Sequence, residues 1–130
     1  MNQDPLTKQI IEFLQERGWD NPSPGAIAKS ISIESSELLE LFQWDDMSIE
    51  KLKKDPDKLQ EVRAEVGDIM IYCLQMTGLL GLSYEEIVEE KLAKVKAKYP
   101  AKEMASRPKD SIDTTEDEYL KIKKQHRKNS

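Results

Sequence analysis

The sequence predicts an all-α protein, and three observations support this class. The chain of 130 residues is long enough for one domain with its own core, but too short for two domains of usual size. Hydrophobic residues make up 38% of the chain and aromatic residues only 6%, so the core is mainly aliphatic, which favours packed helices. Cap residues followed by proline recur ahead of apolar residues at helical spacing. We therefore expect a four-helix bundle, with a short fifth helix near the C-terminus.

Each expected helix has a start signal in the sequence. Asp4-Pro5, Ser23-Pro24 and Asp55-Pro56 are N-cap residues followed by proline at the first helical position, and Ser83 with Glu86 forms a capping box. The expected ranges are about 5–17, 24–42, 56–78 and 84–99, with one short turn of helix over 48–54.

The last thirty residues differ in composition from the rest of the chain. They hold eight Lys or Arg and six Asp or Glu, which leaves the first hundred residues with a net charge of −7. Thr115 and Glu118 form another capping box, which predicts a helix over 115–127. We expect a catalytic domain over 1–100 and a charged tail over 101–130.

Charge and cysteine content limit the partners and the compartment. The net charge of −5 argues against nucleic-acid binding through a basic surface. The single cysteine, Cys73, lies in an apolar run, and neither a secretory signal nor a membrane span is visible, so we expect a cytoplasmic protein without a membrane partner. The single histidine, His126, excludes zinc sites built from several histidines. Carboxylates remain as the abundant ligand type.

Acidic side chains fall where two helices should be apolar. On a helical wheel Glu34 lies in the middle of the stripe formed by Ile27, Ile31, Leu38 and Leu41, and Glu37 lies on its flank. A carboxylate in a buried stripe is costly unless it is paired, whereas Glu40 points away and needs no such explanation.

The next long helix repeats this pattern. Glu65 and Asp68 lie along one edge of its apolar seam, together with Tyr72. Four carboxylates between two antiparallel helices would repel one another unless a divalent cation neutralised them. Oxygen ligands without histidine favour Mg²⁺, or Mn²⁺, over zinc. The alternative is that these acids belong to solvated helix faces. The presence of two such acid pairs on adjacent helices favours the metal site over this alternative.

Two lysines and a tryptophan are candidates for substrate contacts. Lys91 and Lys94 share one face of the expected helix over 84–99, where they could meet phosphate oxygens or be solvated helix residues. Trp44 is either a packing residue or one wall of a base pocket, because an aromatic face stacks on a nucleobase.

The pattern Glu34-Ser-Ser-Glu37 followed by Glu65-Val-Gly-Asp68 resembles the signature of the MazG-like all-α NTP pyrophosphohydrolases, in particular the short single-domain kind typified by dCTP pyrophosphatase. The resemblance covers about residues 8–100. It implies hydrolysis of a nucleoside triphosphate, expected to be a dNTP, to the monophosphate and pyrophosphate, for sanitation or balance of the nucleotide pool. It also implies that the four acids bind Mg²⁺, that Tyr72 and Lys91 touch the phosphates, and that Trp44 borders the base.

Two questions stay open at this stage. Either Glu34 or Glu37 is the residue that accepts the proton of the attacking water, and the pattern does not choose between them. The alternative function is a non-catalytic helical module for nucleotide binding or interaction on the same fold. For either function we expect a homodimer or homotetramer, because Ile71 and Leu74 lie away from the apolar seam of their helix.

Overall fold

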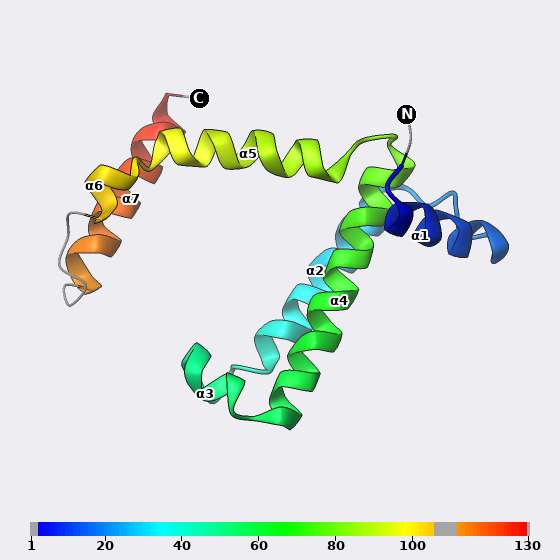
Figure 1. Ribbon diagram of the computed structural model, residues 1–130, viewed down its shortest axis with the longest axis horizontal. Helices are drawn as coiled ribbons and strands as arrows, with labels where there is room; N and C mark the ends of the chain where they lie inside the picture. Colours follow the sequence, from blue (N-terminus) through cyan, green and yellow to red (C-terminus); the bar gives the residue numbers. More distant parts are fainter. Residues whose placement is uncertain (1–2, 106–111, 130) are drawn as a thin grey trace. The chain divides into compact units, whose positions relative to one another are not determined.

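The computed structural model describes residues 3–105 and 112–129, and over these residues it is helical without a strand. Seven helices follow one another (Figure 1). They are α1 (Pro5–Glu16), α2 (Pro24–Glu40), α3 (Ile49–Lys53), α4 (Pro56–Leu79), α5 (Tyr84–Lys98), α6 (Ala101–Ala105) and α7 (Ile112–Lys128). The all-α prediction is confirmed, and the four expected long helices each end within two residues of their expected bounds.

The start signals in the sequence act as caps in the structure. Four side chains each accept a hydrogen bond from the backbone N–H three residues later, at 2.9, 3.1, 3.2 and 3.0 Å: Asp4, Ser23, Ser48 and Asp55. Each bond satisfies one of the N–H groups that lack a partner at a helix start, so the chain stops and restarts helices at defined residues.

The chain forms two compact units, Met1–Tyr84 and Glu85–Ser130, which are described separately. In the first unit α2 and α4 run antiparallel, and their contact is the most extensive between any two helices (Figure 1). Helices α1 and α3 also pack on α4. Helix α4 is therefore the element on which the whole first unit is built.

The core of this unit lies where α1 crosses the C-terminal half of α4. Ile10 and Leu14 of α1 are buried together with Leu74 of α4, and Ile11 and Tyr84 pack against them. Leu74 was expected on the side of α4 that a second subunit covers, and in this respect the prediction was wrong. Helix α1 of the same chain covers Leu74. The apolar pattern of α4 alone does not show that α1 folds back onto this face.

The second unit consists of α5, α6 and α7. Tyr99, just after α5, stacks on Tyr119 of α7, with ring centroids 5.1 Å apart and an angle of 15° between the planes. The tail helix was expected over 115–127, but it starts three residues earlier. Helix α6 was not predicted. Pro100 ends α5, yet its carbonyl accepts hydrogen bonds from the N–H groups of Glu103 and Met104 and so starts another helical turn.

Among the described residues, no single helix combines the length and the apolar character needed to cross a membrane. The consecutive helices α4 and α5 pass that test only when they are taken together as one broken span.

Gly78 sets how closely α1 approaches α4. A Cβ atom at this position would lie 2.7 Å from Cγ2 of Thr7 and 3.0 Å from Cδ1 of Ile11, whereas a Cβ at Gly67 of the same helix would meet nothing within 4 Å. Thr7 is buried, so it has little room to move.

We expect Gly78→Ala to have a lower free energy of unfolding than Gly67→Ala, by about 1–3 kcal/mol, because overpacking opposes the gain in helix propensity that both variants share. Urea unfolding followed by circular dichroism measures this difference. Equal stability of the two variants would contradict the close packing of α1 on α4.

Candidate metal centre

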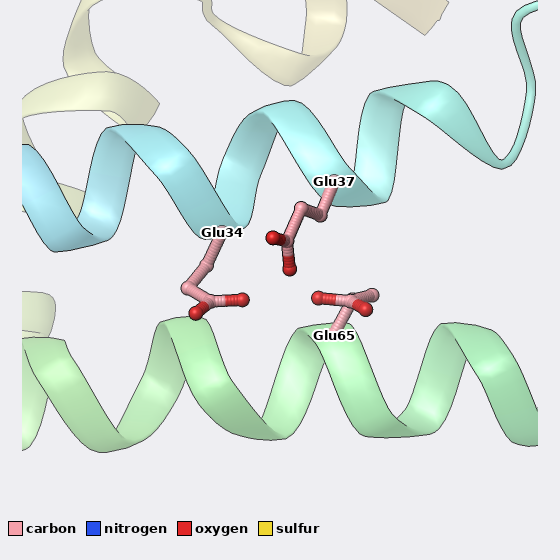
Figure 2. Close-up of side chains that lie close together, drawn as sticks. All are labelled: Glu34, Glu37 and Glu65. Carbon is pink, nitrogen blue, oxygen red and sulfur yellow. The ribbon is translucent and has the colours of Figure 1, made fainter.

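Three carboxylates converge between the antiparallel helices α2 and α4. Glu34 and Glu37 extend from α2, and Glu65 extends toward them from α4 (Figure 2). One oxygen of each lies within 4.8 Å of the others. Spacing by three residues places Glu34 and Glu37 on one face of α2, and the pairing of the helices brings Glu65 opposite that face.

Two oxygens of this cluster have neither solvent nor a hydrogen-bond donor. Oε2 of Glu34 and Oε2 of Glu65 are both buried and accept no hydrogen bond. None of the ion pairs among the described residues involves the three glutamates. A buried acceptor without a partner is costly, so these oxygens are suited to a ligand that brings positive charge.

The proximity of the acids changes their protonation. A hydrogen bond with Glu37 raises the pKa of Glu34 from its ordinary value to about 7, and both burial and the negative charge of Glu37 act in the same direction. Burial also raises the pKa of Glu65, while its hydrogen bond with Glu34 partly opposes that rise. Near pH 7 and without a cation, Glu34 is therefore about half protonated.

Asp68 lies one turn beyond Glu65 on α4, and its side chain is exposed. It is not one of the three residues whose oxygens converge. Its negative charge nevertheless contributes to the raised pKa of both Glu34 and Glu65. Asp68 therefore borders the cluster. Among the described residues no other Asp, Glu, His or Cys forms such a group, and all three members of this group were predicted from the sequence.

The residues present fit a hard divalent cation. The donors are carboxylate oxygens without sulfur or imidazole, which Mg²⁺ and Mn²⁺ prefer over the metals that bind thiolates and histidines. A cation between the three carboxylates would satisfy the two buried oxygens and favour the ionised form of Glu34. The geometry thus suits a small oxygen-liganded ion.

The other predicted site residues lie at several places in the chain. Tyr72 is half-buried on α4, one turn beyond Asp68. Trp44 lies in the connection after α2, where its side chain is 90% exposed. Lys91 and Lys94 are exposed on α5, in the second compact unit. The structure brings together only the three glutamates.

Comparisons with known proteins identify the family of the chain. The MazG-like family matches residues 29–113, a range that includes all four predicted ligands. A pyrophosphatase from Archaeoglobus fulgidus, known from its crystal structure, is 37% identical in sequence to this chain, and the two structures superpose with a TM-score of 0.63. The similarity covers 73% of this chain and 89% of the archaeal chain. No curated protein sequence matches the chain. Because the family match extends over more than half of the 130 residues, the chain belongs to the MazG-like family.

Proposed function

We propose that this protein hydrolyses a nucleoside triphosphate, with a deoxynucleoside triphosphate as the expected substrate, to the monophosphate and pyrophosphate. The observation that carries the proposal is the convergence of Glu34, Glu37 and Glu65, with two buried oxygens that lack a partner. Membership of the MazG-like family and the similarity to a pyrophosphatase support the same reaction class. Such an activity would sanitise or balance the nucleotide pool, and we propose a cytoplasmic location for it.

In this proposal the four acids, Asp68 included, hold Mg²⁺ or Mn²⁺. The bound ion would supply positive charge for the phosphate oxygens and increase the acidity of the attacking water. Glu34 or Glu37 accepts the proton of that water as it attacks the α-phosphorus. The bond between the α-phosphorus and the bridging oxygen then breaks, and pyrophosphate leaves.

Four further residues are proposed to hold the substrate. The hydroxyl of Tyr72 donates a hydrogen bond to the phosphates, and Lys91 and Lys94 offset their negative charge. Trp44 offers an exposed ring on which a base stacks, a contact worth about 1–3 kcal/mol in single-stranded nucleic-acid complexes. These assignments concern positioning, which provides most of the catalysis in phosphoryl transfer.

The products test the reaction class. In a panel of NTPs and dNTPs with Mg²⁺, we expect the monophosphate and pyrophosphate in equal amounts, because attack at the α-phosphorus releases the β- and γ-phosphates together. Ion-exchange chromatography separates the products. A nucleoside diphosphate as the primary product would contradict the proposal, and substrate binding without turnover would favour the non-catalytic module.

The metal ligands are tested by Glu65→Gln. We expect this variant to lose activity by at least the 10–100-fold that is typical when residues that only orient metal ligands are lost. The rise of the melting temperature with Mg²⁺ should also disappear, since ligand binding stabilises only the native state. Glu40→Gln, an exposed change at the end of α2, is the matched control and should keep both properties. Retention of both by Glu65→Gln would place the site elsewhere.

The raised pKa of Glu34 predicts how stability depends on pH without metal. Its folded-state pKa of about 7 lies above the unfolded value, so its stabilising contribution is complete below about pH 4.5 and is lost as the pH rises through 7. In EDTA, the melting temperature of the wild type should therefore fall more between pH 5 and pH 8 than that of Glu34→Gln. Differential scanning fluorimetry measures both slopes, and parallel slopes would contradict the raised pKa of Glu34.

Self-association belongs to the same proposal, as a homodimer or a homotetramer. Ile71 on α4 is 48% exposed, and the neighbouring Met70 is also exposed. Burying such aliphatic surface contributes about 25 cal/mol per Å², so contact with a second copy would stabilise the chain.

We expect Ile71→Lys to reduce the mass measured by light scattering, because a charge replaces an apolar contact, while Ile71→Leu should preserve the mass. A wild-type mass of 15.0 kDa at micromolar concentration, with full activity, would refute self-association.

A further inference from the structure

Gln75 of α4 is a polar side chain that the first unit buries without supplying a hydrogen bond. It is 7% exposed and lies in the same part of the helix as the buried residues Leu74 and Gly78. None of the side-chain hydrogen bonds among the described residues involves its amide. Neither amide atom, however, is among the fully buried nitrogen and oxygen atoms that lack a partner there, so the end of the side chain still reaches the surface. The amide of Gln75 is therefore available to a ligand.

Gln75 lies on the face of α4 that carries the candidate site. At about 100° per residue, Asp68, Tyr72 and Gln75 lie within about 60° of one another around the helix axis. At about 1.5 Å per residue, Gln75 lies about 4.5 Å beyond Tyr72 and about 10 Å beyond Asp68 along the axis. This direction leads from the carboxylates to the end of α4 that α1 covers. A substrate whose phosphates are held at the acids can therefore extend along α4 to Gln75.

The surroundings of Gln75 suit a neutral group better than a charged one. The buried residues where α1 meets this end of α4 are aliphatic, namely Ile10, Leu14 and Leu74. A phosphate would lose its hydration there, and a neutral amide compensates only a small part of that loss. A nucleobase is an uncharged ring whose edge carries hydrogen-bond donors and acceptors. Gln75 therefore matches the base of a nucleotide better than its phosphates.

We propose that the amide of Gln75 binds the hydrogen-bonding edge of the substrate base and so determines which base the site prefers. Its NH2 group donates to an acceptor of the base, and its carbonyl oxygen accepts from a neighbouring N–H of the base. A base without this pattern leaves the amide unsatisfied, which weakens its binding. The inference rests on the proposed hydrolysis and adds to it the residue that selects the base.

Trp44 lies at the other end of the helix pair. Helices α2 and α4 run antiparallel, so Trp44, which follows α2, lies beyond the acids on the side of α3, whereas Gln75 lies on the side of α1 (Figure 1). Within one chain a base therefore contacts one of these two residues but not both. Stacking on an aromatic ring discriminates little, because every base has a π-face. A choice among bases favours Gln75, and stacking on Trp44 is the competing outcome of the test.

Hydrolysis of the four common dNTPs by the wild type and by Gln75→Met tests the proposal. We expect the wild-type kcat/KM to differ at least roughly tenfold between the best and the poorest base, as paired hydrogen bonds to a base edge discriminate by this order. Gln75→Met should lose most of this ratio, because methionine keeps the length of the side chain but not its hydrogen bonds. Hydrolysis of 2-deoxyribose 5-triphosphate, which has no base, should be affected least. Gln60→Met, an exposed change on the same helix, is the matched control and should keep the wild-type ratio.

Several results would overturn the proposal. One is the absence of any preference among bases in the wild type, and another is an equal preference in the wild type and Gln75→Met. An equal loss of activity on all substrates, including the one without a base, would show that Gln75 only supports the fold. Loss of the preference in Trp44→Ala but not in Gln75→Met would place the base at the other end of the helix pair.

Folding of the variant is checked by its melting temperature. We expect that of Gln75→Met to equal or exceed the wild-type value, because an apolar side chain replaces a buried amide that has no partner. Gln75→Leu, a second apolar variant, should show the same loss of base preference.

A second measurement does not depend on turnover. Isothermal titration calorimetry with uncleavable α,β-methylene dNTPs and Mg²⁺ should give the same order of bases for the wild type, and Gln75→Met should bind all four with similar affinity. Selective binding without hydrolysis would contradict the proposed function and leave the role of Gln75 in place. Hydrolysis without selectivity would contradict the role of Gln75 alone.

Discussion

Repulsion between carboxylates is the constraint on which the rest of the first unit depends. Glu34, Glu37 and Glu65 lie close enough that the pKa of Glu34 is raised to about 7, and two of their oxygens are buried without a partner. A helix pair selected only for stability would place aliphatic side chains here. The apolar contacts of α1 with α4 must therefore offset the cost of holding the acids together.

Most of the fold could be predicted because its signals are local. The N-cap residues Asp4, Ser23 and Asp55 determine where helices begin. Each accepts a hydrogen bond from the backbone three residues later, and this short spacing can be recognised in the sequence. Leu74 could not be placed, since its burial depends on where α1 returns in space. Helix α6 was missed for a related reason. A proline ends one helix by local rules, but its carbonyl remains free to start another turn.

In the candidate site, too, the local relations between residues could be predicted, whereas the relations that depend on packing could not. A spacing of three positions places Glu34 and Glu37 on one face of α2, and the antiparallel packing of α2 and α4 brings Glu65 opposite them. Asp68 shares that spacing with Glu65, yet its exposed side chain is not among the converging groups. Which members of an acidic edge point inward depends on the rotation of α4 about its own axis. That rotation is set by the packing of α2, α1 and α3 on α4, and most of these contacts lie outside the motif.

The distribution of apolar residues along the first unit determines how firmly the acids are held. Ile27 is buried at the start of α2, and Leu52 of α3 is buried beyond its end, where α3 packs on α4. The carboxylates lie between these two anchors. The distances between the carboxylates are thus set by apolar contacts on either side of the cluster, which hold α2 and α4 in place. Evolution could adjust the affinity for an ion through residues that never touch it, and keep every ligand unchanged.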